Sequence, residues 1–257
     1  MPSNNNSGRV YIFNVTTGSL LYTLTNPNAY GTSDADNFGS SVAIDGNKII
    51  VGTLDEDDAG GTTSGKAYIY DISTFASFTP SIISSANYVL DNPNAYGTSF
   101  NDRFAESVAI SGNYAIVGAR FEDDASGNNS GKAYIFDATT GNLLHTLDNP
   151  NPFGTSADDR FGLNVAIDGN RAIVSANGED DASGTNVGKA YIFDVATGSL
   201  IRTLDNPNAY STSSYDGFGS SVAISGNYAI VGATGEDEPG SSASGKVYIF
   251  NVTTGSL

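Results

Sequence analysis

Four short acidic runs are the residues of this sequence best suited to chemistry. The runs are Asp55–Asp58, Glu122–Asp124, Glu179–Asp181 and Glu236–Glu238. Each lies in a Gly- and Ser-rich segment, where carboxylates and loop carbonyls together can bind Ca²⁺, a hard cation that takes oxygen ligands. The candidate calcium ligands are Asp57, Asp58, Asp123, Asp124, Asp180, Asp181, Glu236 and Asp237.

These acidic runs allow three interpretations, and the sequence leaves all three open. In the first, the carboxylates cap turns by accepting backbone N–H bonds, as Asp commonly does in loops. In the second, they bind calcium. In the third, they form a docking surface for a basic partner, which is compatible with calcium binding.

The sequence contains few residues in the combinations that catalysis requires, and we predict no enzyme activity. The chain has no Cys and a single His, His145. An active site needs different residues from different parts of the fold, whereas the acidic motif is nearly the same in each copy. Gly131-Lys132 and Gly188-Lys189 lack the Ser or Thr that ends a phosphate-binding loop.

The amino-acid composition argues against nucleic acids and anionic membranes as binding partners. Eleven Lys and Arg face 28 Asp and Glu among 257 residues, a net charge of −17. Such a chain repels nucleic-acid backbones and anionic membranes, which are bound through Lys and Arg. No apolar run approaches the ~20 residues of a membrane helix, and Met1–Asn6 does not have the pattern of a secretory signal.

The elements that position the acidic runs come from an internal repeat. Tyr-Ile-Phe or Tyr-Ile-Tyr recurs with spacings of 57, 66, 57 and 57 residues, starting at Tyr11, Tyr68, Tyr134, Tyr191 and Tyr248. Phe-Gly-x-x-Val-Ala-Ile or a near match starts at Phe38, Phe104, Phe161 and Phe218. Repeats of this length are typical of solenoids and propellers.

One repeat predicts four short strands, A to D, here given for the third copy. The ranges are 161–168, 171–176, 189–195 and 199–204. A and B are apolar on both faces, which predicts burial on both sides. We therefore expect an all-β propeller of four-stranded antiparallel blades, with a solenoid of stacked hairpins as the alternative.

The expected organisation is a single repeat domain over residues 1–257, with about four blade equivalents. A partial blade of strands C and D over 1–30 precedes blades at 38–95, 104–152, 161–209 and 218–257, the last one incomplete. Ser7–Leu20 and Ser244–Leu257 are almost identical. Three interpretations follow: closure of four blades across the termini, a fragment of a larger propeller, or self-assembly through the terminal strands.

Phe-Gly-x-Ser-Val-Ala-Ile, Ala-Ile-Val-Gly-Ala and Gly-Lys-Ala-Tyr-Ile-Phe-Asp together resemble the FG-GAP repeat. This repeat is the blade unit of integrin α-chain propellers and of bacterial and phage surface proteins. The resemblance implies adhesion or binding of a protein or glycan ligand, on a cell surface or virion outside the cell. The family's calcium loop is missing, because connections such as Asp168-Gly169-Asn170 carry one carboxylate at most.

Strand order predicts where the charge lies. In an up-down-up-down blade the A–B and C–D turns share one face, and the B–C loops and D–A links share the other. The second pair carries most of the acids. We therefore predict an acidic face that binds cations or a partner; the alternative is a purely structural repeat that spaces or decorates an assembly.

One insertion distinguishes the first full copy from the others. It spans residues 73–87, between strands C and D, and carries Phe75, Phe78, Ile82 and Ile83. These apolar side chains predict either an extended hairpin packed on its neighbour or a contact with a partner.

Overall fold

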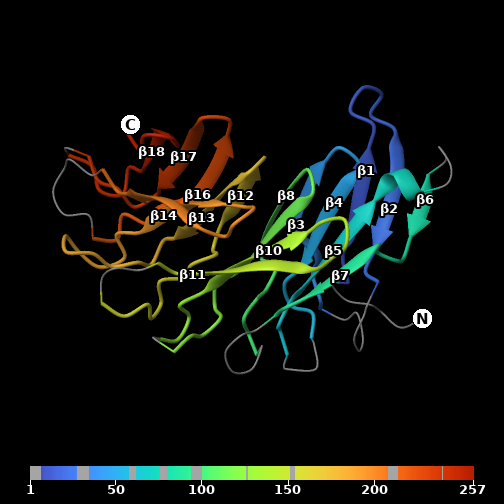
Figure 1. Cartoon of the computed structure of the whole chain (residues 1–257), viewed down its shortest axis with the longest axis horizontal. Coiled ribbons are helices and arrows are strands. Elements are labelled where there is room, and N and C mark those ends of the chain that lie inside the picture. The colour runs from blue at the N-terminus through green and yellow to red at the C-terminus, as the bar shows by residue number, and fades with distance from the viewer. Residues whose placement is uncertain are drawn as a thin grey trace.

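The computed structural model describes residues 7–27, 35–57, 62–75, 80–93, 100–125, 127–150, 154–207, 214–238 and 240–257. These residues form strands and one short 3-10 turn, η1 (Ile72–Thr74). The strands make five sheets that follow one another along an arc (Figure 1). The all-β prediction is confirmed.

Three sheets contain strands A to D in chain order, each antiparallel to the next. The first comprises β3 (Phe38–Asp45), β4 (Lys48–Thr53), β5 (Lys66–Asp71) and β7 (Tyr88–Asp91). The second comprises β8 (Ser107–Ser111), β9 (Tyr114–Ala119), β10 (Lys132–Asp137) and β11 (Leu143–Asp148). The third comprises β12 (Val165–Asp168), β13 (Arg171–Ala176), β14 (Lys189–Asp194) and β15 (Leu200–Asp205).

The two outer sheets have three strands each. β1 (Arg9–Phe13) and β2 (Leu20–Thr25) correspond to strands C and D, and β6 (Ser81–Ile83) pairs with β2 in parallel. At the other end lie β16 (Phe218–Ser225), β17 (Tyr228–Ala233) and β18 (Lys246–Asn251), which correspond to strands A, B and C.

Closure of four blades across the termini is not found among the described strands. β1 pairs with β2, and the two outer sheets lie at opposite ends of the arc (Figure 1). The edge of β17 that β1 would need is occupied by β18, from Tyr228 opposite Asn251 to Ala233 opposite Lys246. The near-identity of β1 and β18 makes them competitors for that edge.

Strand A is shorter than predicted in the two central sheets. β12 begins at Val165 rather than Phe161, whereas β3 and β16 begin at the corresponding Phe. Ser40 and Ser220 donate hydrogen bonds to the carbonyls of Gly52 and Gly232 on strand B, which holds the beginning of those strands in the sheet. Glu106 and Leu163 occupy the same position in the central sheets.

Apolar burial holds the sheets face to face. Between the second and third full sheets, Ile116 and Ile135 pack against Val174, Tyr191 and Phe193. The interfaces on either side of it repeat this cluster with the corresponding residues. The first interface, beside β1 and β2, has its own cluster around Ile12, Tyr68 and Tyr70. Strand B is buried along almost its whole length in the three full sheets, as its continuous apolar run predicts. Strand A is only partly buried, so the prediction of burial on both faces is not met for that strand.

Hydrogen bonds between sheets define two faces of the arc. The B–C loops bond to the neighbouring D–A links, for example from Asn101 N to Thr62 O at 3.0 Å. On the opposite side A–B turns meet, where Gly226 N donates to Asp168 at 2.6 Å. We name these the loop face and the turn face, and their composition agrees with the predicted strand order.

Candidate functional site

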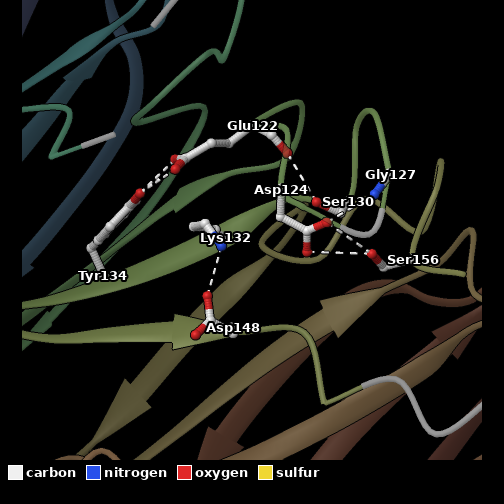
Figure 2. Close-up of polar contacts among 8 residues, drawn as sticks. All are labelled: Glu122, Asp124, Gly127, Ser130, Lys132, Tyr134, Asp148 and Ser156. Carbon is white, nitrogen blue, oxygen red and sulfur yellow. Dashed lines mark hydrogen bonds and ion pairs between the residues drawn. The ribbon is translucent and has the colours of Figure 1, made fainter. Parts of the chain in front are cut away.

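The loop face is built on one buried glutamate in each repeat. Each glutamate is fully buried and accepts a hydrogen bond from a tyrosine hydroxyl on strand C. The pairs are Glu56–Tyr68, Glu122–Tyr134, Glu179–Tyr191 and Glu236–Tyr248. In the second pair the Tyr134 Oη to Glu122 Oε1 distance is 2.6 Å, and Figure 2 shows the carboxylate pointing toward Tyr134 and away from Asp124. The glutamate of each of these four pairs is therefore part of the core.

Burial changes the protonation of this unit. The cost of desolvation raises the pKa of Glu179 to about 8, against the opposing hydrogen bond from Tyr191. Burial and the adjacent Glu179 also raise the pKa of Tyr191, so the tyrosine keeps its proton and remains the donor. Glu179 is thus a carboxyl group that titrates near neutral pH.

The aspartate that directly follows each buried glutamate caps its own loop. Its carboxylate accepts the backbone N–H six residues later, at 2.7–2.9 Å. The acceptors are Asp57, Asp123, Asp180 and Asp237, and the donors are Thr63, Asn129, Asn186 and Ala243. This is the turn-capping interpretation of the sequence. Among the calcium candidates, these four carboxylates are held apart, each in its own loop.

The acid that follows this capping aspartate has local partners as well. Asp124 accepts from Gly127 N at 2.9 Å and from the Ser156 hydroxyl of the next link (Figure 2). Asp181 accepts from Ser183 N at 2.6 Å. Burial works to raise the pKa of Asp181, but hydrogen bonds from Ser183 outweigh it and lower the pKa. Asp58 lies outside the described residues.

The described residues contain no group of three His, Cys, Asp or Glu side chains that could hold a metal ion. Of the calcium candidates, Glu236 is buried in the core and the described Asp side chains serve their own loops. Calcium binding therefore stays a prediction without a preformed site among these residues.

Acids of the D–A links are also structural. Each accepts a side-chain amide from the Asn that begins its link, and each is buried. The pairs are Asn26–Asp36, Asn92–Asp102, Asn149–Asp159 and Asn206–Asp216. Side-chain hydrogen bonds thus fix both ends of the links.

A lysine beneath the loop face orients one exposed carboxylate in each full sheet. Lys132 Nζ lies 2.6 Å from Asp148 Oδ1 (Figure 2), and Lys189 Nζ lies 2.6 Å from Asp205 Oδ1. Lys66 and Asp91 form the same pair. The aspartate side chains are 65–72% exposed, whereas the lysine side chains are 5–7% exposed. Lys132 and Lys189, singled out for their Gly-Lys motifs, therefore form ion pairs.

The insertion makes an internal contact. Phe75 packs edge-on against Tyr22, with ring centroids 5.2 Å apart, and Ile83 joins the same cluster from β6. Ile82 points outward and is exposed. Phe78 lies outside the described residues. Packing on the neighbouring sheet accounts for Phe75 and Ile83. Of the candidate contact residues that the structure describes, Ile82 is the one left exposed to a partner.

His145 lies at a strand D position whose side chain contacts the C–D turn of the next sheet, a role that the sequence analysis did not identify. Its Nε2 lies 3.0 Å from the carbonyl oxygen of Ala196, in the C–D turn of the next sheet. Tyr88 and Arg202 occupy the same position in their sheets and donate to the carbonyls of Thr139 and Thr253. A long side chain with a terminal hydrogen-bond donor occurs at this position of every repeat, and this pattern could have indicated the contact.

Glu106 and Arg120 of the second full sheet differ from the residues at the same positions of the other repeats, and they contact each other. Arg120 Nε donates to Glu106 at 2.7 Å, and its guanidinium lies 4.2 Å from the centre of the Phe121 ring. Glu106 thus replaces a small residue because it has a local cationic partner.

The repeated antiparallel sheets, packed face to face with strand A innermost and strand D outermost, define a β-propeller-like repeat protein. The model of the FG-GAP repeat matches residues 28–70, 94–136, 153–193 and 209–250, and the chain belongs to this family. FG-GAP repeats commonly form propeller domains that take part in binding or adhesion. A search of curated proteins finds no match.

A solved structure supports the fold alone. The chain is similar to the crystal structure of the computationally designed Ika4 protein, with a TM-score of 0.51 and 16% identity, over 91% of this chain and 99% of that one. In the part of the chain that the structure describes, no helix is long and apolar enough to cross a membrane.

Proposed function

We propose that this protein is a non-catalytic recognition module of a cell-surface or virion protein, and that its loop face binds a partner rich in basic groups. The observation that carries the proposal is the orientation of Asp91, Asp148 and Asp205. Each is oriented by a buried lysine, and most of its side chain is exposed. The same geometry recurs in successive sheets, so it presents negative charge at regular intervals.

The charge distribution favours a cationic partner over a bound metal ion. The capping carboxylates are each engaged by one backbone N–H, as Asp123 is by Asn129. Exposed charges on a rigid frame attract an opposite charge at longer range and increase the association rate. The net charge of −17 strengthens this attraction.

A deca-lysine peptide tests the proposal. We expect saturable binding that weakens steeply between 50 and 500 mM salt, because the Debye length falls over this range. Replacing Asp91, Asp148 and Asp205 together with Asn should weaken binding at least about fivefold, because three exposed charges of the site are lost. Fluorescence anisotropy with a labelled peptide measures both effects.

The matched control changes the same charge on the turn face. Asp45, Asp168 and Asp194 replaced with Asn should alter the affinity less than about twofold, because these residues lie on the opposite side. Equal losses from both triple variants would mean that net charge alone attracts the peptide. That result would contradict a binding site on the loop face.

A further inference from the structure

The two ends of the arc expose the two halves of the interface that the chain repeats internally. At the first end Val42 and Ile44 of β3 are 54% and 59% exposed, whereas the corresponding Val108 and Ile110 are 8% and 6% exposed. The difference arises because no described strand lies beside β1 where strands A and B would stand.

The uncovered area forms a groove, which we name the end groove. It has a volume of about 260 Å³ and is lined mainly by apolar side chains of β1 and β3, including Tyr11, Phe13, Val42 and Ile44. Its floor and one wall correspond to surfaces that strands A and B cover in the complete sheets.

At the other end, the last sheet exposes the opposite half. Ile230, Val247 and Ile249 are 43%, 68% and 55% exposed, whereas the corresponding Ile116, Ala133 and Ile135 are fully buried against the next sheet. The last sheet therefore has strands A and B, which the first sheet lacks, and a face suited to packing on β3.

We propose that two copies of this chain associate through their ends by strand exchange. β16 and β17 of one copy enter the end groove of the other, and β1 of that other copy replaces β18 on the edge of β17. The product is a four-stranded sheet of β16 and β17 from one copy with β1 and β2 from the other. If each copy uses both ends, the assembly is a closed dimer with two identical junctions.

Sequence and polar contacts support the exchange. Residues 7–20 and 244–257 differ only at Arg9 and Lys246, so β1 can reproduce the side-chain contacts that β18 makes with β17, apart from those of Lys246. Lys246 Nζ donates to Glu236 Oε1 at 2.9 Å, while Glu236 Oε2 is buried without a hydrogen-bond partner. Arg9 is exposed, and its guanidinium could engage both oxygens of this carboxylate.

Exchange is favourable because β1 pairs with β17 through the same residue types as β18, while additional apolar surface is buried. β18 is released, its hydrogen bonds to β17 are remade by β1, and Ile230 covers Val42 and Ile44 of the other copy. Exchange within one chain would have to bring the opposite ends of the arc together, whereas exchange between two copies pairs one end of a chain with the opposite end of the other (Figure 1).

Light scattering coupled to size exclusion tests the association. The full chain should elute with twice the mass of one chain at micromolar concentration. Ile230→Asp and Val42→Asp should each shift it toward the monomer by at least about tenfold in the dissociation constant. Ile201→Asp should not, although Ile201 is also exposed, at 40%. A wild-type monomer at every concentration would overturn the proposal.

Disulfide trapping tests the register, since the chain has no Cys. Tyr228 lies opposite Asn251 in the present sheet and would lie opposite Asn14 of the second copy after exchange. A mixture of Asn14→Cys and Tyr228→Cys chains should give a covalent dimer on oxidation, and neither chain alone should. Absence of the mixed dimer, while a Tyr228→Cys/Asn251→Cys chain still closes its internal disulfide, would contradict strand exchange.

Discussion

Replacing Gly131 with alanine is expected to destabilise the protein by about 2–5 kcal/mol. Gly131 begins strand C with φ of +78°, and a Cβ there would lie 2.0 Å from the carbonyl oxygen of Phe161 in the next sheet. Left-handed backbone costs an L-residue ~1–2 kcal/mol, and overpacking at a backbone contact adds ~1–3 kcal/mol. Thermal unfolding should show a fall of roughly 4 °C or more in Tm.

Gly245 is the matched control for this substitution. It occupies the same repeat position with φ of +74°, but the atom nearest to its added Cβ would be the carbonyl oxygen of Thr234 at 3.4 Å. Gly245→Ala should therefore cost only the backbone strain of ~1–2 kcal/mol. Equal losses from the two variants would mean that close approach between sheets does not explain the glycine.

This pair of glycines illustrates what the sequence could predict. The Gly-Lys pairs precede strand C in a repeat whose strand order follows from apolar periodicity and turn residues, and the all-β fold was predictable from these signals. The reason for the glycine was not, because it depends on a backbone carbonyl 30 residues later in the next sheet. Contacts between repeats depend on how neighbouring sheets approach each other, and the residue pattern within one repeat does not specify this.

The acidic runs show the same limit at the site. Their position in the B–C loops was predictable, and the turn-capping interpretation describes Asp123 and Asp180. Burial of Glu122 and Glu179 was not, because a run of acids in a Gly-rich segment is typical of an exposed loop. The partner tyrosines begin the Tyr-Ile-Phe motif, so pairing each Tyr with the Glu 12 residues earlier was the available signal.

Lowering the pH from about 8 to 5 is expected to stabilise this protein. Glu179 has a pKa of about 8 in the folded state because burial disfavours its charged form. In the unfolded chain its carboxyl group has the ordinary glutamate pKa of 4.5, so the folded state binds more protons between these two pH values. Stability from this group is then fully present below pH 4.5 and is lost as pH rises toward 8.

The slope of this dependence is set by one proton. The free energy of unfolding should fall by up to about 1.4 kcal/mol per pH unit across the window. Glu179→Gln keeps an acceptor for Tyr191 and removes the titration, so its urea midpoint should vary less with pH. The variant should be close to wild type at pH 5 and more stable than wild type at pH 8.

A second charge-neutralising variant separates titration from relief of charge repulsion. Glu238→Gln removes the same charge from an exposed position of the same loop face, and it should leave the slope unchanged. Below pH 4 the trend should reverse, because hydrogen bonds from Ser73 and Thr139 lower the pKa of Asp71 and Asp137, which lose stabilisation when they are protonated. A Glu179→Gln slope equal to that of wild type would show that Glu179 is ionised throughout this range. The buried glutamate would then depend on Tyr191 and Lys189 to hold its charge in the core.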